Sequence, residues 1–173
     1  MTQLIPNRKV PALDLPLVRE GRFSIHEARP EYLTGIGFYR GLHCPICKDW
    51  LEQLDGLVED YGALGVSVVA VSMDEPARAR KTRMDWDIGR VPIAHDMSEE
   101  TARAWGLYIS TRREGSEEPE RFSEPGLFLV RPDGTLFGCS VQSMPFTRPD
   151  WNDLLGGLKF IKEKDYPARG AAT

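Results

Sequence analysis

Two cysteines separated by two residues offer the clearest chemistry in the sequence. Cys44 and Cys47 stand in "GFYRGLHCPICKDWLEQL", residues 37–54, with Pro45 between them and His43 directly before them. Such a pair can be a redox dithiol, half of a metal site, or two small residues packed in a core. The elements around the pair help to distinguish these three alternatives.

The cysteines follow a predicted strand and begin a predicted helix. Residues 32–40, "YLTGIGFYR", read as a buried strand because aromatic and branched side chains dominate them. From Pro45 to about Tyr61, apolar residues recur at steps of three and four, which indicates an amphipathic helix. Pro45 fits the first helical turn, so Cys44 is expected at the junction.

A helix start can convert a cysteine into a nucleophile. A free thiol has a pKa of about 8.5, and the unpaired N–H groups and dipole of a helix start can lower it to about 3.5–7.5. Cys47 lies one turn further along the same face, about 5–6 Å away and within reach of a disulfide. The spacing therefore predicts an attacking thiolate, Cys44, and a resolving partner, Cys47.

The metal and core alternatives fit less well. A structural zinc site needs four ligands, and the sequence has no second Cys-x-x-Cys or His-x-x-x-His. Cys139 with His26, His43 or His95 could complete such a site only through the fold. Two inert buried cysteines are the other alternative, but a position at a helix start argues against it. No metal and no bound cofactor are expected.

The rest of the chain alternates between strand and helix patterns, which predicts an α/β fold with a central mixed β-sheet flanked by helices on both faces. The predicted segments are a short strand within 21–28, a central strand over 66–74, a helix over 75–89, a short strand within 91–97, a helix capped by Ser98, a charged mobile loop over 110–121, a hairpin over 126–141, and a helix over 148–164.

Length and composition indicate one ordinary globular domain. The 173 residues are 41% hydrophobic and 28% charged, and we expect a single domain over 1–173 with an extended leader, 1–20, and a flexible tail, 165–173. The net charge of −4 without a basic cluster argues against nucleic-acid and membrane-surface binding. No signal peptide or membrane-spanning pattern is seen, so a cytoplasmic location is expected, where a Cys-x-x-Cys pair is more often catalytic than structural.

Three motifs together resemble a known family. "FYRGLHCPICKDWLEQL", "VSVVAVSMDEP" and "SEPGLFLVRPDGTLF" are similar to the thioredoxin-like superfamily, and within it to the peroxiredoxin-like branch of the AhpC/TSA (alkyl hydroperoxide reductase/thiol-specific antioxidant) family. The resemblance runs from about Pro11 to about Ile161 and implies a thioredoxin-like fold.

The resemblance also implies roles for single residues. Cys44 matches the peroxidatic or nucleophilic cysteine, and Cys47 matches the second cysteine of a thioredoxin-type active site. Pro125 matches the proline that packs against the dithiol, so Glu124–Pro125 is expected to be a cis peptide bond. Cys139 would be redundant as a resolving cysteine and is expected to be a core residue.

The sequence departs from the family at the position three residues before the nucleophile. Family members carry a threonine there, whereas this chain has Gly41. The arginine usual in the family could be replaced by Arg40 or Arg121, either of which would stabilise the thiolate. His43 could tune the thiolate or donate a proton to the leaving group, or it could only shape the rim of the pocket.

The dithiol predicts a thiol-dependent oxidoreductase, and the resemblance implies an antioxidant role. Cys44 would attack a hydroperoxide or a disulfide, Cys47 would close an intramolecular disulfide, and a thioredoxin- or glutaredoxin-like protein would reduce it. The chain has no glycine fingerprint for a nucleotide, so direct use of NADPH is not expected. The alternatives are a disulfide oxidoreductase without peroxidase activity and a non-catalytic redox-sensing interaction module. Relatives in this family often form dimers, so a homodimer is also an option.

Overall fold

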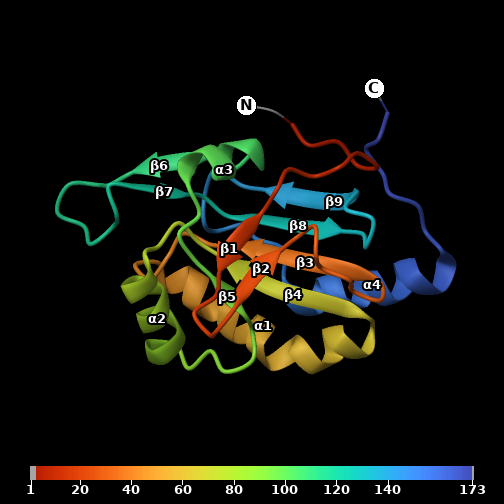
Figure 1. The fold of residues 1–173 in the computed structure, drawn as a ribbon, viewed down its shortest axis with the longest axis horizontal. Helices are drawn as coiled ribbons and strands as arrows, with labels where there is room; N and C mark the ends of the chain where they lie inside the picture. The colour runs from red at the N-terminus through yellow and green to blue at the C-terminus, as the bar shows by residue number, and fades with distance from the viewer. Residues whose placement is uncertain (1–2, 173) are drawn as a thin grey trace.

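The computed structural model describes residues 3–172, arranged around a central five-stranded sheet (Figure 1). The first two residues of the predicted leader and the last residue of the predicted tail lie outside the described residues. The strands are β1 (Asp14–Pro16), β2 (Arg22–Ser24), β3 (Leu33–Phe38), β4 (Val66–Val71), β5 (Ile93–Ala94), β6 (Ile109–Thr111), β7 (Arg121–Ser123), β8 (Gly126–Val130) and β9 (Leu136–Val141). The helices are α1 (Pro45–Ala63), α2 (Pro76–Asp85), α3 (Glu99–Ala104) and α4 (Trp151–Lys164).

The central sheet is mixed, as the sequence predicted. Its strand order is β5-β4-β3-β8-β9. β3 pairs in parallel with β4, from Leu33 opposite Val66 to Phe38 opposite Val71, and α1 makes the crossover between them. β8 runs antiparallel to both β3 and β9. β3 therefore lies in the middle of the sheet and delivers its carboxyl end to the start of α1.

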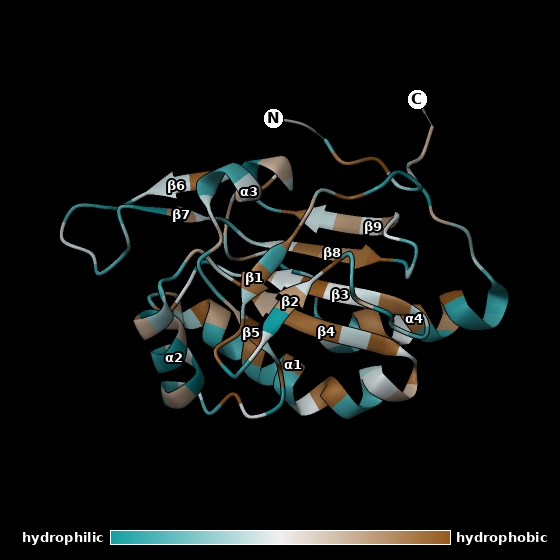
Figure 2. Cartoon of the chain, viewed as in Figure 1, coloured by the Kyte–Doolittle hydropathy of each residue, from teal (hydrophilic) through white to brown (hydrophobic). Residues whose placement is uncertain are grey.

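Each face of the sheet is covered by its own apolar cluster. On one face, Leu51 and Leu54 of α1 pack with Leu158 of α4. On the other face, Phe38 and Phe128 pack edge to face with 5.5 Å between ring centroids, in a cluster that includes residues of α3 and the N-terminal segment. Figure 2 shows the hydrophobic colouring concentrated in the strands of the central sheet. Burial on both faces explains why β3 and β4 read as nearly continuous apolar runs.

The two shorter sheets were predicted only in part. β2 lies in the segment 21–28, where a short strand was predicted, but its partner β1 lies in the predicted leader, and β6 pairs with β7 across the segment expected to be a charged loop. The prediction of a loop over 110–121 was therefore wrong at both ends. Only three residue pairs form each hairpin, so the strands are too short to show a clear alternation of apolar and polar residues. The β6–β7 hairpin extends from the molecule beside α3 (Figure 1).

α4 continues through the two glycines that weaken its middle. Asp150 caps the helix by accepting backbone N–H bonds from Asn152 and Asp153, and Trp151 and Leu158 are fully buried. Burial of these large side chains outweighs the low helix propensity of Gly156 and Gly157, which costs about 1 kcal/mol each. None of the helices among residues 3–172 is long and apolar enough to cross a membrane.

Candidate active site

Cys44 is the N-terminal cap of α1. Its backbone is extended (φ −104°, ψ 103°), and its sulfur accepts the backbone N–H of Cys47 at 3.3 Å. Pro45 follows in the first turn, where its missing N–H leaves no hydrogen bond unmade. The sulfur therefore occupies the position where a helix start favours a negative charge. The side chain is almost completely buried, at 1% exposure.

Two guanidinium groups flank this sulfur. Arg40 Nη1 lies 3.9 Å from Cys44 Sγ, and Arg148 Nη2 lies 3.7 Å from it. Hydrogen bonds from the Cys47 side chain, the Cys47 backbone N–H and Arg40, together with the positive charge of Arg148, outweigh the effect of burial and lower the pKa of Cys44 to about 5. The sulfur of Cys44 is accordingly a thiolate at neutral pH.

Cys47 has the opposite character. It is fully buried, and burial together with its hydrogen bond to Cys44 raises the pKa of Cys47 well above its ordinary value. Its sulfur accepts from the Arg40 backbone N–H at 3.4 Å and from Arg148 Nη2 at 3.1 Å. One nitrogen of Arg148 thus touches both sulfurs, which are not joined by a disulfide. The pair holds one anionic sulfur and one protonated sulfur side by side.

Arg148 is a residue of the site that sequence reasoning missed. It belongs to the segment before α4, 104 positions from Cys44. Its guanidinium lies over the ring of Trp50 at 5.3 Å, and its Nε donates to the carbonyl of Pro145 at 3.0 Å. The segment "SMPFTRPDW" carries no periodic pattern that would direct this side chain to the cysteines. Only the fold brings it there.

Of the two arginines predicted to contact the thiolate, only Arg40 does so. Arg121 lies on β7, and its guanidinium forms an ion pair with Glu99, with Nη2 2.6 Å from the carboxylate. Its side chain is 42% exposed. The prediction for Arg121 is therefore corrected: alternation along the short strand β7 points Arg121 outward and Phe122 inward.

His43 is neutral in this site. Burial and the nearby charge of Arg40 lower the pKa of His43 to about 4. Both ring nitrogens are buried without a hydrogen-bond partner, and the ring packs edge-on against Phe122 with 4.7 Å between centroids. A neutral imidazole without a contact to Cys44 cannot stabilise the thiolate by charge. The arrangement fits a residue that shapes the pocket.

The loop between β3 and Cys44 has a shape that only glycine allows. Gly41 has φ +123°, and a Cβ built there would lie 2.7 Å from Oδ1 of Asp74. The Asp74 carboxylate is buried and accepts the backbone N–H of Leu42 at 2.8 Å, while the carbonyl of Gly41 accepts the N–H of Cys44 at 3.1 Å. Asp74 therefore occupies the space that a threonine side chain at position 41 would need.

The bond before Pro125 is trans. No cis peptide bond occurs among residues 3–172, so the predicted cis Glu124–Pro125 bond was wrong. The backbone N–H of Glu124 donates to the backbone carbonyl of Tyr108 at 2.8 Å, and the carbonyl of Pro125 accepts the backbone N–H of Gln142 at 3.1 Å. The trans form, ordinarily favoured by about 0.5–1 kcal/mol before proline, joins β7 to β8 with both flanking hydrogen bonds made.

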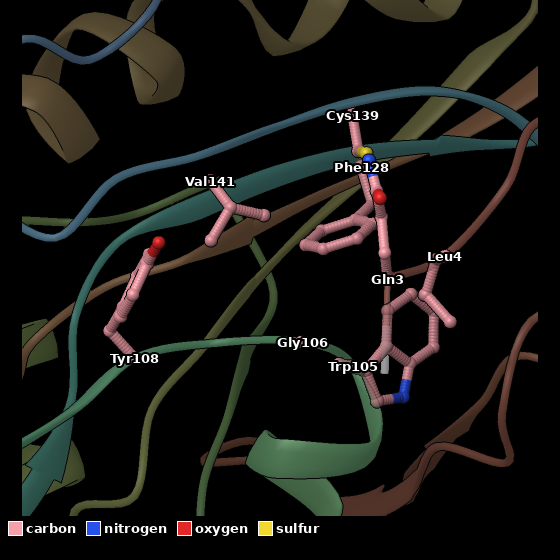
Figure 3. Close-up of a pocket in the computed structure, with 8 residues that line it drawn as sticks. All are labelled: Gln3, Leu4, Trp105, Gly106, Tyr108, Phe128, Cys139 and Val141. Atoms are coloured by element: carbon pink, nitrogen blue, oxygen red, sulfur yellow. The ribbon is translucent and has the colours of Figure 1, made fainter. Parts of the chain in front are cut away.

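Cys139 lies on the other side of the sheet from the dithiol. It faces Phe128 in the β8–β9 register, and Phe128 belongs to the cluster opposite α1. The prediction of a core position was wrong: Cys139 is exposed because β9 is an edge strand with half-covered side chains. Figure 3 shows it with Trp105 and Tyr108 around a cavity of about 360 Å³. The sheet separates this sulfur from Cys44.

A second cavity, of about 320 Å³, lies beside Arg148, the arginine that contacts both sulfurs. Trp50 and Arg148 contribute to its wall, together with Phe146, whose side chain is 72% exposed. Within residues 3–172, no group of three or more His, Cys, Asp or Glu side chains is arranged to hold a metal ion.

Comparisons with known proteins agree with the fold described above. The model of the AhpC/TSA family matches residues 6–137. The chain is similar in structure to peroxidoxin BcpB from Mycobacterium tuberculosis, with 15% identity, 92% of this chain and 99% of that chain covered, and a TM-score of 0.73. It is also similar to a mutant of the peroxiredoxin 6 of Arenicola marina, with 16% identity, 95% of this chain and 76% of that chain covered, and a TM-score of 0.77. A peroxiredoxin-like protein from Aquifex aeolicus is similar as well, with 16% identity, 93% of this chain and 90% of that chain covered, and a TM-score of 0.74. No match was found among curated proteins.

Proposed function

The chain belongs to the AhpC/TSA family, and on that premise we propose that it is a thiol peroxidase in which Cys44 attacks a hydroperoxide and Cys47 resolves the product. One observation carries the proposal: a thiolate and a thiol share a buried site, both in contact with the same guanidinium nitrogen.

The first step is a nucleophilic substitution at oxygen. The Cys44 thiolate donates an electron pair to one oxygen of the hydroperoxide, the O–O bond breaks, and Cys44 becomes a sulfenic acid. The other oxygen leaves as an alkoxide or hydroxide and takes a proton from water. The positive charges of Arg40 and Arg148 near the sulfur would stabilise the negative charge that builds up on both oxygens.

The second step joins the two sulfurs. Cys47 attacks the sulfenic sulfur, the S–S bond forms, and the sulfenic oxygen leaves as water with the proton of the Cys47 thiol. One hydroperoxide and two thiols thus become one alcohol, one water and one disulfide. A thioredoxin- or glutaredoxin-like dithiol would return the pair to the reduced state. This cycle requires a reducing compartment, which we propose to be the cytoplasm.

Mass spectrometry after addition of stoichiometric hydrogen peroxide to the reduced protein tests this function. We expect a disulfide that joins Cys44 to Cys47 and consumption of one equivalent of peroxide. Cys44→Ser should abolish both. Cys47→Ser should still consume one equivalent but should stop at a sulfenic acid on Cys44, which dimedone traps. Cys139→Ser is the matched control and should behave like the wild type, because Cys139 lies across the sheet.

A second candidate is a disulfide oxidoreductase without peroxidase activity. It is favoured by Gly41, because this position supplies no hydroxyl to orient a peroxide oxygen. In this case Cys44 attacks a disulfide, and Cys47 releases the mixed disulfide. Reduction of insulin or of a glutathione mixed disulfide without reaction with peroxide would select this candidate. Failure in both assays would leave the redox-sensing interaction module, and size-exclusion chromatography would test the homodimer.

A further inference from the structure

We propose that Glu118 and Glu124 are positioning residues of the active site, which together hold the Arg40 guanidinium against Cys44. The inference rests on the proposed role of Cys44 as the nucleophile. If so, the β6–β7 hairpin contributes to the active site, although its sequence predicted a mobile charged insertion.

The first step in the argument is how Arg40 is held. Each of its three guanidinium nitrogens faces a different anion: Nε lies 3.2 Å from Glu124 Oε2, Nη2 lies 3.3 Å from Glu118 Oε1, and Nη1 lies 3.9 Å from Cys44 Sγ. The contact to sulfur is the longest of the three. Glu118 accepts a hydrogen bond from Nη2, whereas Glu124 attracts Nε by charge without hydrogen-bond geometry. Together the two carboxylates hold the guanidinium so that its third nitrogen faces the sulfur.

The ring of Phe122 supports the same orientation. The Arg40 guanidinium carbon lies 4.8 Å from the centroid of this ring. Phe122 lies in β7 and Glu124 directly follows the last residue of this strand, so one short segment provides both the stacking surface and one of the two carboxylates.

The second step is that both carboxylates are themselves fixed. Glu124 accepts the hydroxyl of Ser110 at 2.6 Å, and its side chain is 5% exposed. Glu118 is 2% exposed, and its two oxygens accept from the backbone N–H and Nε of Arg113 and from the hydroxyl of Ser116. Burial opposes the charge on Glu118, but these donors outweigh it and hold the pKa of Glu118 at about 2.

The third step is what this arrangement excludes. A charged loop with no function in the site would expose its carboxylates, as the neighbouring Glu117 does. A buried carboxylate costs free energy unless its partners compensate, and Arg40 is the partner that links this one to the cysteine. We therefore assign to the loop between β6 and β7 the function of delivering Glu118 to Arg40.

Glu118→Gln can change the pKa of Cys44 in two opposite directions, and the test distinguishes them. Removal of a negative charge near a thiolate would by itself lower the pKa of Cys44. Loss of positioning does the reverse, because both oxygens of Glu118 accept hydrogen bonds and an amide offers only one acceptor. We expect the midpoint of Cys44 ionisation to rise by about one pH unit, which is a tenfold loss of thiolate below the midpoint.

The measurement is the ultraviolet absorbance of the thiolate across pH, with Cys44→Ser as the blank. It needs no reagent to reach a buried sulfur and no peroxidase activity. Glu117→Gln is the matched control, since it removes the same charge from an exposed position one residue away. The midpoint should not rise in this control. When Arg40 is already replaced by Gln, adding Glu118→Gln should no longer raise the midpoint of Cys44 ionisation.

Several results would overturn the inference. These are a midpoint in folded Glu118→Gln that stays or falls, an equal rise in Glu117→Gln, or a rise that persists without Arg40. If Glu118→Gln does not fold, Glu118→Asp decides, because it keeps the charge and shortens the reach: a raised midpoint supports positioning, and an unchanged one refutes it. A wild-type midpoint near the ordinary thiol value would instead refute the proposed function.

Discussion

Replacing Gly41 by alanine should destabilise the protein and disturb the loop that leads to Cys44. The new Cβ would lie 2.7–2.9 Å from three atoms of the Asp74 carboxylate, which real Cβ atoms do not tolerate. Asp74 cannot move away freely, because it is bound to the backbone N–H of Leu42 and to Arg78. The same substitution must also adopt φ +123°, which residues with a side chain rarely reach.

The expected cost follows from these two effects. A strained backbone conformation costs about 1–3 kcal/mol, and a buried carboxylate that loses a hydrogen bond costs about 1–3 kcal/mol more. We therefore expect Gly41→Ala to lose about 2–6 kcal/mol of unfolding free energy. Gly41→Thr, which introduces the residue usual in the family, should lose at least as much and should not improve the reaction with peroxide.

Urea denaturation of the reduced protein measures this difference. Gly56→Ala is the matched control: Gly56 lies within α1, and a Cβ there would meet nothing within 4 Å. This control should gain about 0.5–1 kcal/mol, because alanine is the better helix former. If Gly41→Ala proved as stable as the wild type, the account of the loop would be wrong.

Two further predictions concern charge at the dithiol. Arg148→Gln should raise the ionisation midpoint of Cys44 by about one pH unit, because Arg148 contacts both sulfurs. In the same absorbance titration, Arg80→Gln on the exposed face of α2 should leave this midpoint unchanged. The folded-state pKa of Cys44 is depressed to about 5, so between about pH 5 and 8.5 the unfolded chain binds more protons than the folded one. The reduced wild type should therefore gain stability relative to Cys44→Ser as pH rises through this range. Urea titrations of both proteins at several pH values measure the difference, and an advantage that shrinks as pH rises would contradict the lowered pKa.

The sequence predicted the parts of the fold that depend on local pattern. β3, β4 and α1 follow from long apolar runs and regular spacing, and the position of Cys44 at the start of α1 follows from Pro45 and the amphipathic stretch behind it. The mixed sheet followed from the order of the elements. These features are encoded within windows of ten to twenty residues, where periodicity is readable.

The parts that were missed depend on contacts between distant segments. Nothing near Arg148 indicates that its guanidinium reaches two sulfurs in another part of the chain. Glu118 looks like a solvated charge in "GSEEPER" because burial of a carboxylate depends on the partners that the fold supplies. The outward position of Arg121 depends on the phase of a three-residue strand, which so short a segment does not reveal.

The placement of Cys139 on an exposed edge strand has a practical consequence for any quantification of thiols. A reagent such as Ellman's can reach this exposed sulfur without opening the buried site, so part of the signal from native protein would report on the bystander. Air oxidation could likewise link two copies through it and yield a covalent band on a non-reducing gel that carries no information about turnover. Alanine at position 139 removes both artefacts while leaving the dithiol untouched.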